Sequence, residues 1–194
     1  MPQQTEHLTR VGHELLPVKH TDSPVAKFNL LGTCASCHEG DNTRRGLKNG
    51  DAIAHFRDSI PGQGLYKMGL NVSPSCNDCH GVHDIKSIKD TAAHTSRAAL
   101  SKTCGACHVG VERTYAASVH GQLPLTAGGK TAVCTDCHTA HDIERPGSAH
   151  FKQTIDQKCG QCHEERLANY RETYHGKAML LGKANTATDG AACY

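Results

Sequence analysis

Five segments of the chain share the pattern Cys-x-x-Cys-His, which places two thiols and an imidazole close together on the backbone. Two thiols at this spacing can add to the two vinyl groups of one haem, and the histidine that follows can bind the haem iron from one side. The cysteines are Cys34, Cys37, Cys76, Cys79, Cys104, Cys107, Cys134, Cys137, Cys159 and Cys162. The histidines, which we expect to be the proximal iron ligands, are His38, His80, His108, His138 and His163. The sequence therefore predicts five covalently attached haem c groups.

Three other kinds of site also use the spacing Cys-x-x-Cys. Structural zinc sites, thioredoxin-like redox pairs and disulfide frameworks all contain it. None of them requires a histidine at the next position, whereas every one of the five segments here has one. The pattern therefore favours haem attachment over these alternatives.

The motifs alternate between two types with a period of about 57 residues, which indicates a repeated two-haem unit. In the first type, a second histidine follows the haem histidine twelve residues later and precedes glycine, as at His120 and His175. In the second type, another histidine follows at the third position, as at His83 and His141.

Two positions are informative because they break or extend this repeat. Cys193 falls where a further motif of the second type would begin, so a sixth haem is an option, and a free terminal thiol is the alternative. In the first period, Pro61 stands where the repeat places a histidine. Proline cannot bind iron, so His55 is the nearest substitute, with His13 and His20 as rivals.

Each haem iron needs a second axial ligand unless that position stays open to substrate. The predicted distal ligands are His55, His83, His120, His141 and His175. These five equal the haems in number, which favours bis-histidine coordination throughout. His94 and His150 are reserves, and Met68 or Met179 could ligate instead, with a higher potential as the result.

Two segments that follow first-type motifs contain spaced apolar residues and neither glycine nor proline. These segments, Val111–His120 and Glu164–His175, are predicted to be short helices that end at the next glycine. A continuous helix of twelve residues rises about 18 Å, so His120 could not bind the haem of His108. We therefore expect distal ligands to cross between motifs and to hold neighbouring haems close together.

The remaining sequence indicates loops at 41–51, 61–75 and 123–131, and no segment predicts a strand convincingly. The predicted fold is mostly α with extensive loop, in which short helices wrap around a chain of closely packed haems with little or no sheet. Residues 1–30 are expected to form an N-terminal arm. Residues 31–194 are expected to form one multihaem domain of repeated two-haem units, cut inside a sixth haem motif.

Composition agrees with an interior filled by cofactors rather than by side chains. The chain has no Trp, three Phe and five Tyr, and 37% of its residues are hydrophobic. Lys and Arg total 21 against 19 Asp and Glu, without a block of one sign, so we expect no nucleic-acid partner. No apolar run is long enough to span a membrane. The N-terminus lacks a secretory signal, although haem c is expected outside the cytoplasm, so we expect the export signal to be missing from this sequence.

The order Ser-x-His-Gly followed by Cys-x-x-Cys-His-x-x-His resembles the doubled-motif multihaem cytochromes of bacterial anaerobic respiration, over residues 34–194. The resemblance implies closely spaced, mostly bis-histidine haems of low potential. They would carry electrons from quinol oxidation to terminal reductases, minerals or partner cells, in the periplasm or outside the cell. It implies other redox proteins or cytochrome subunits as partners, and it leaves open a homo-oligomer or a filament that acts as a nanowire.

The rival function is that of an enzyme, a multihaem reductase of nitrogen or sulfur oxyanions with one open haem site. The replacement of the expected histidine by Pro61 supports this alternative, because it removes one predicted iron ligand. The absence of a Cys-x-x-Cys-Lys variant and the surplus of histidines count against it. The sequence therefore predicts an electron carrier with no catalytic residues.

Overall fold

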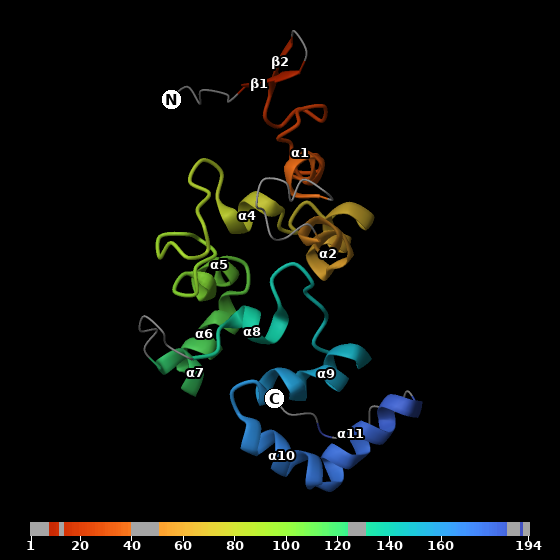
Figure 1. Ribbon diagram of the computed structural model, residues 1–194. Coiled ribbons are helices and arrows are strands. Elements are labelled where there is room, and N and C mark those ends of the chain that lie inside the picture. Colours follow the sequence, from red (N-terminus) through yellow and green to blue (C-terminus); the bar gives the residue numbers. More distant parts are fainter. Residues whose placement is uncertain (1–7, 12–13, 40–50, 124–130, 186–190, 192–194) are drawn as a thin grey trace. The chain divides into compact units, whose positions relative to one another are not determined.

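The computed structural model describes residues 8–11, 14–39, 51–123, 131–185 and 191, and they form mostly short helices joined by loops (Figure 1). The chain divides into two compact units. The first comprises residues 1–96 together with 141–143, and the second comprises 97–140 together with 144–194. The predicted class, mostly α with little sheet, is confirmed.

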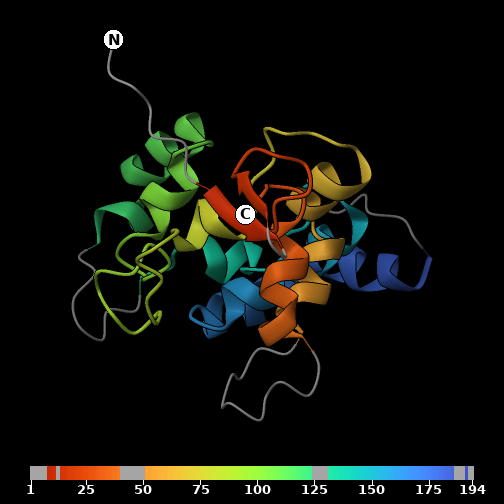
Figure 2. The same cartoon turned by 90° about the horizontal axis from the view of Figure 1, so that it is seen from above.

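The first unit carries its two Cys-x-x-Cys-His segments on separate short helices, α1 and α4. Its elements in chain order are β1 (Leu8–Val11), β2 (Glu14–Pro17), α1 (Leu30–His38), α2 (Ala52–Asp58), α3 (Ile60–Gly62), the π-helix η2 (Gln63–Lys67) and α4 (Cys76–His80). Strands β1 and β2 pair antiparallel, with Leu8 opposite Pro17, and Figure 2 shows them side by side. The sequence indicates neither strand, because each has only four residues.

A small apolar core in the first unit packs against two of the predicted haem cysteines. Its buried members are Leu31, Ile53 and Phe56. The ring of Tyr66 meets Phe56 edge-on, with 6.5 Å between the ring centroids. Cys34 of α1 and Cys76 of α4 both pack against this cluster. Burial of these apolar side chains therefore helps to fix α1 and α4, and it does so next to the cysteines that are predicted to bind haem.

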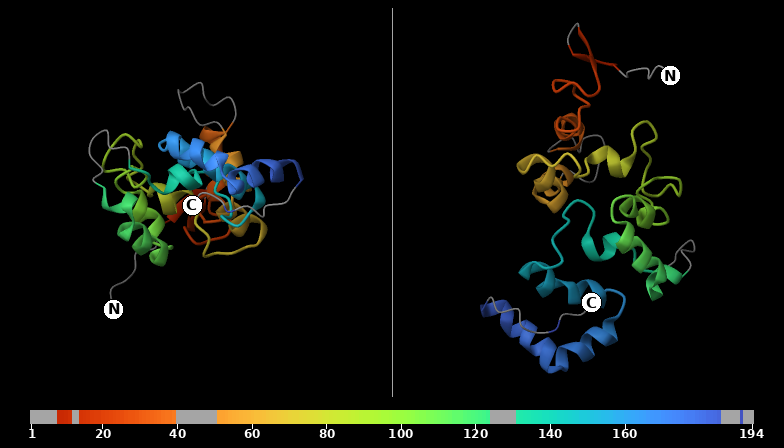
Figure 3. Two further views of the ribbon diagram at one scale, coloured as in Figure 1. Left: turned by 90° about the horizontal axis from the view of Figure 1, so that it is seen from below. Right: turned by 180° about the vertical axis from the view of Figure 1, so that it is seen from behind.

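The second unit holds the remaining three motifs. Its elements are α5 (Leu100–Gly105), α6 (Val109–Ala117), α7 (Val119–Gln122), α8 (Cys134–His138), α9 (Ala149–Gly160), α10 (Glu164–Glu172) and α11 (Tyr174–Asn185). Figure 3 shows the bend between α10 and α11. The same kind of bend separates α6 from α7, so the two-motif repeat seen in the sequence is also a repeat of local structure.

Each of these bends is a helix break at serine or threonine, and α2 and α3 are separated in the same way. The side-chain oxygen accepts a hydrogen bond from the amide of the glycine three residues later. The pairs are Ser59 with Gly62 at 3.2 Å, Ser118 with Gly121 at 3.2 Å, and Thr173 with Gly176 at 3.1 Å. Glycine is required because a Cβ at Gly121 would collide with the carbonyl oxygen of Tyr115, and the other two glycines meet equivalent collisions.

The sequence prediction of one continuous helix is therefore wrong for both Val111–His120 and Glu164–His175, and so are the predicted helix ends. Each is two helices, broken at Ser118 or Thr173, and the glycine lies inside the second helix instead of ending the first. The physical reason is that serine and threonine cap a new helix better than they continue an old one. Pro61 occupies the second position of α3, where His120 and His175 stand in α7 and α11.

The loop predicted over 61–75 is wrong in its first part, because α3 and η2 continue to Lys67 from the cap at Ser59. The loops predicted at 41–51 and 123–131 lie almost entirely outside the described residues. In the described ranges, no helix combines the length and the apolar character that crossing a membrane requires.

Candidate haem-attachment sites

A capping box fixes the helix that carries the second motif. The amide of Ser75 donates to Asp78 Oδ2 at 2.7 Å, and Lys27 Nζ lies 3.3 Å from the same oxygen. Burial raises the pKa of Asp78, but the hydrogen bonds from Ser75 and Lys27 outweigh it and lower that pKa overall. The segment before α1 is thus tied to α4, so the first and second motifs lie together.

The first cysteines of these two motifs are in contact. Burial raises the pKa of the Cys76 thiol to about 12, and the charge and hydrogen bond of Cys34 add to this effect. Tyr66, whose pKa is raised to about 12 by burial and then by Cys76, packs beside them. Two haems attached here would therefore be joined to neighbouring sulfur atoms.

The rings of two histidines lie near each other in the first unit, at a separation that suits two ligands of one metal ion. The rings of His80 and His141 lie nearly parallel, with an interplanar angle of 14° and 6.0 Å between centroids. Burial lowers the pKa of both, with a further contribution from His38 for His80 and from His80 and His55 for His141. The amide of Ile60 donates to the carbonyl of Ile143 at 2.9 Å and so holds the His141 segment against α3.

The second unit repeats the capping arrangement around the fourth motif. The amide of Val133 donates to Asp136 Oδ2 at 2.7 Å. Arg97 binds the same carboxylate with both terminal nitrogens, at 3.0 Å and 2.8 Å, and also donates to the carbonyl of Thr131 at 2.8 Å. Arg97 lies seven residues before Cys104, as Lys27 lies seven residues before Cys34. In each unit a cation therefore clamps a first-type motif to the following second-type motif.

The first cysteines of the third and fourth motifs are also in contact. A hydrogen bond from Cys104 lowers the pKa of Cys134 to about 7, although burial opposes the change. The helices that carry them, α5 and α8, pack against each other. Paired attachment points are thus a feature of both units.

A second pair of facing histidines lies in the second unit. The rings of His120 on α7 and His163, directly before α10, have centroids 6.1 Å apart and an interplanar angle of 44°. The hydroxyl of Thr131 donates to the carbonyl of His120 at 2.6 Å. The cap at Ser118 also fixes α7, so the position of His120 is determined from both sides.

His138, the predicted haem ligand of the fourth motif, is half-buried and packs against α9. The ring of Phe151 stacks on His138 with 5.3 Å between centroids. Lys158 donates to the carbonyl of Cys137 at 2.9 Å and lies 5.4 Å from the Phe151 ring centroid. Burial, then Lys158 and His108, lower the pKa of His138.

The residue after a second-type haem histidine has positive φ in both motifs that the structure describes. Gly81 has φ 83° and ψ 179°, and Thr139 has φ 63° and ψ −176°. This region is nearly restricted to glycine, so the threonine stores strain. The strained turn lies between His138 and His141, where the chain leaves the motif.

Of the predicted distal ligands, the structure brings His120 and His141 beside His163 and His80, which are predicted proximal ligands. His83 is exposed, and among the described imidazoles it pairs with none. The ring of His175 lies 6.0 Å from that of Tyr174 between centroids. His55 is exposed and lies in electrostatic range of His141. These three remain predictions.

The reserve ligands lie in other environments. His94 Nε2 lies 2.8 Å from Asp84, and His150 Nδ1 lies 2.8 Å from Glu144. Met68 is exposed and Met179 is buried. His20 accepts a hydrogen bond from the amide of Asp22 at 3.2 Å, and His13 lies outside the described residues, as does Cys193.

Sequence reasoning missed the clamp residues Lys27, Arg97, Asp78 and Asp136. The signal was present, because a cation seven residues before one motif and an aspartate inside the next recur in phase with the repeat. It also missed Tyr115, whose hydroxyl donates to the carbonyl of Ala132 at 3.0 Å, two residues before Cys134. Tyr170 makes the same contact with Ala191, at 2.8 Å.

The geometry fits haem better than it fits a metal ion held by protein ligands alone. Two imidazoles on opposite sides of one metal, at metal–nitrogen distances of about 2.0–2.1 Å, have ring centroids about 6.3 Å apart. The two observed separations agree with this value. Within the described ranges, no three His, Cys, Asp or Glu gather as a metal site would need. Apolar side chains next to the motifs are exposed, including Val82, Ile85, Val109 and Val111, and a bound macrocycle would cover such surfaces.

Comparison with known proteins supports the same group. Residues 124–168 match the family model described as the doubled CXXCH motif. Over these residues the chain carries the doubled CXXCH motif. This motif indicates covalently bound haem c. No curated protein and no solved structure matches the chain.

Proposed function

We propose that this chain is a multihaem cytochrome and an electron carrier that passes electrons along five haem c groups, or six if the motif at Cys193 is completed. The observation that carries the proposal is the pairing of attachment points. Cys34 contacts Cys76, and Cys104 contacts Cys134, so haems held there would be near neighbours within each unit. Electron transfer between centres requires such proximity.

The roles of the chain's own residues follow from their chemistry. The ten motif cysteines would form the thioether links, and the histidine after each pair would bind iron from the proximal side. A haem bound in this way supplies a one-electron centre, and an iron with two protein ligands has no place for substrate. The predicted distal histidines would therefore favour transfer over catalysis.

We place this function outside the cytoplasm, in the periplasm or at the cell exterior. Haem c proteins are usually exported, which supports this location. The partners would be other redox proteins or cytochrome subunits, and a homo-oligomer or filament is the assembly in which such a carrier could extend its path. Size-exclusion chromatography and microscopy of the holoprotein would test that assembly.

One observation favours a second candidate, a multihaem reductase of nitrogen or sulfur oxyanions. Pro61 occupies the helix position that holds His120 and His175 in the two equivalent steps. The imidazole that the repeat supplies at this step is therefore absent from the first unit. A haem left with one protein ligand would offer an open site for substrate.

Haem quantification and low-temperature electron paramagnetic resonance on the oxidised holoprotein distinguish these functions. The carrier proposal expects five or six covalent haems per chain, all low-spin. A stoichiometric high-spin haem would instead support the reductase. Absence of covalent haem would refute both.

A further inference from the structure

The two histidine pairs, His80 with His141 and His120 with His163, connect motifs in the same way. His80 belongs to the second motif and faces His141, which follows the fourth motif. His163 belongs to the fifth motif and faces His120, which follows the third. Each pair therefore joins motifs of the same type that are one full repeat apart, and neither pair joins residues of a single motif.

Both pairs have the separation expected across one iron. Their centroids lie 6.0 Å and 6.1 Å apart, against about 6.3 Å for two imidazoles that bind one metal at about 2.0–2.1 Å. Rings in direct stacking contact would lie much closer, since carbon atoms in contact are about 3.5–4.0 Å apart. Neither pair is therefore in direct stacking contact.

Specific contacts hold both distal residues in place. The His141 segment is fixed by the hydrogen bond from Ile60 to Ile143 at 2.9 Å, and it leaves its own motif through the strained turn at Thr139. His120 is fixed by the cap at Ser118 and by the hydroxyl of Thr131. One strained backbone turn and three hydrogen bonds therefore position these two histidines.

We infer that His141 is the second axial ligand of the haem on the second motif, and His120 that of the haem on the fifth. The inference rests on the proposed function and adds to it the assignment of ligands to haems. It separates these two residues from His83 and His175, which have the same phase in the repeat but face no proximal imidazole among the described residues.

The test uses His141→Ala and His120→Ala in the haem-loaded full chain. Each variant should keep the wild-type number of covalent haems and convert one haem per chain from low-spin to high-spin in electron paramagnetic resonance. Added imidazole should restore the low-spin signal, because the free ligand fills the vacated position. Arg113→Ala is the control, since Arg113 is exposed and its guanidinium is not among the predicted iron ligands, and it should leave every haem low-spin.

The variants His141→Met and His120→Met test the same assignment if an alanine variant does not accumulate as folded protein. A methionine ligand should preserve the low-spin state while raising the potential of one haem in a redox titration, which a merely structural role would not do. Alanine variants that retain every low-spin haem, with methionine variants of unchanged potentials, would overturn the assignment. That result would leave the carrier proposal standing, whereas wild-type protein without covalent haem would refute the proposal itself.

Discussion

Replacing Arg97 with alanine removes the clamp between the third and fourth motifs. Arg97 makes two bonds to Asp136, at 3.0 Å and 2.8 Å, and one to the carbonyl of Thr131 at 2.8 Å. The ion pair is half-exposed, so it contributes about 0.2–1 kcal/mol, and the bond to Thr131 contributes about 0.5–1.5 kcal/mol. We therefore expect Arg97→Ala to lower the free energy of unfolding by about 1–2 kcal/mol.

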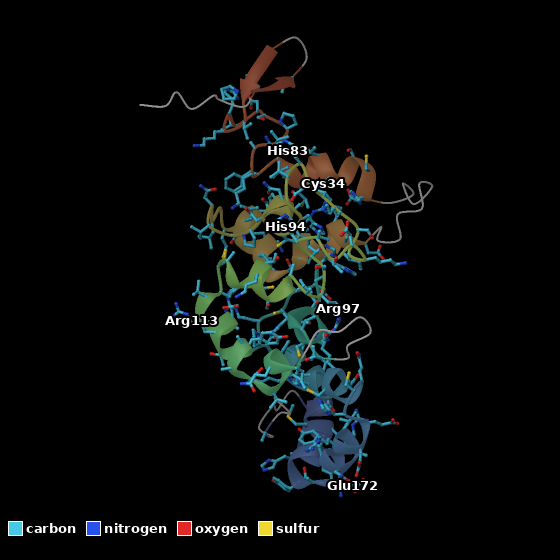
Figure 4. All side chains as sticks on the ribbon, turned by 90° about the vertical axis from the view of Figure 1, so that its left-hand side faces the viewer. Cys34, His83, His94, Arg97, Arg113 and Glu172 are labelled. Atoms are coloured by element: carbon cyan, nitrogen blue, oxygen red, sulfur yellow. The ribbon has the colours of Figure 1, made fainter. Side chains whose placement is uncertain are left out.

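Denaturant unfolding of the holoprotein, followed by far-ultraviolet circular dichroism, measures this loss. Arg113→Ala is the matched control, because Arg113 is exposed and Figure 4 shows it pointing away from α6; it should change stability by less than about 0.5 kcal/mol. Arg97→Lys keeps the charge but loses the two-nitrogen contact, so its effect should be intermediate. Lys27→Ala removes a single contact at 3.3 Å and should cost less than Arg97→Ala. Equal stability of Arg97→Ala and Arg113→Ala would refute the clamp.

The same clamp predicts a pH dependence. The hydrogen bonds from Arg97 are the main cause of the lowered pKa of Asp136. A depressed carboxyl pKa contributes stability above the unfolded value of about 3.9, and this contribution is lost as pH falls through the folded pKa. The difference between wild type and Arg97→Ala should therefore be full at neutral pH and shrink in acid. A difference that persists unchanged well below pH 3.9 would contradict this account.

Four further substitutions, one of them a control, test the local structure by the same unfolding measurement. Gly121→Ala should destabilise the protein by more than about 1 kcal/mol, because its Cβ would strike the carbonyl of Tyr115, whereas Gly110→Ala, with open space, should be neutral or stabilising by up to about 1 kcal/mol. Tyr115→Phe should cost about 0.5–1.5 kcal/mol through loss of the hydrogen bond to Ala132, and no change would mean that water replaces it. Thr139→Gly should stabilise by about 1 kcal/mol by relieving the positive φ, and a loss of stability would show that the turn is not strained.

The haem motifs and the fold class could be predicted because their signals are local. A haem c site needs its two cysteines and its histidine within five consecutive residues, so the spacing alone carries the chemistry. Spaced apolar residues in segments without glycine or proline, together with the absence of convincing strand patterns, likewise predict short helices without a large sheet. None of this depends on which distant segments meet.

The pairing of histidines could not be predicted from the sequence. It depends on turns at which one residue changes the direction of the backbone. Ser118 lies in a segment whose apolar spacing predicts one continuous helix. Its side chain instead caps a new helix, so the segment forms two helices. The turn at Thr139 uses a conformation that threonine rarely adopts. Proximity of His141 to His80 follows from such turns, and residue type alone does not reveal it.

The contacts between first cysteines have a consequence for how the protein is made. Cys34 contacts Cys76, and Cys104 contacts Cys134, so an oxidant that joined either pair as a disulfide would block two attachment sites at once. The second pair is the more reactive, because a hydrogen bond from Cys104 lowers the pKa of Cys134 whereas burial raises the pKa of Cys76, and the thiolate is the form that reacts. Keeping these thiols reduced until haem is attached would therefore protect two sites for each pair.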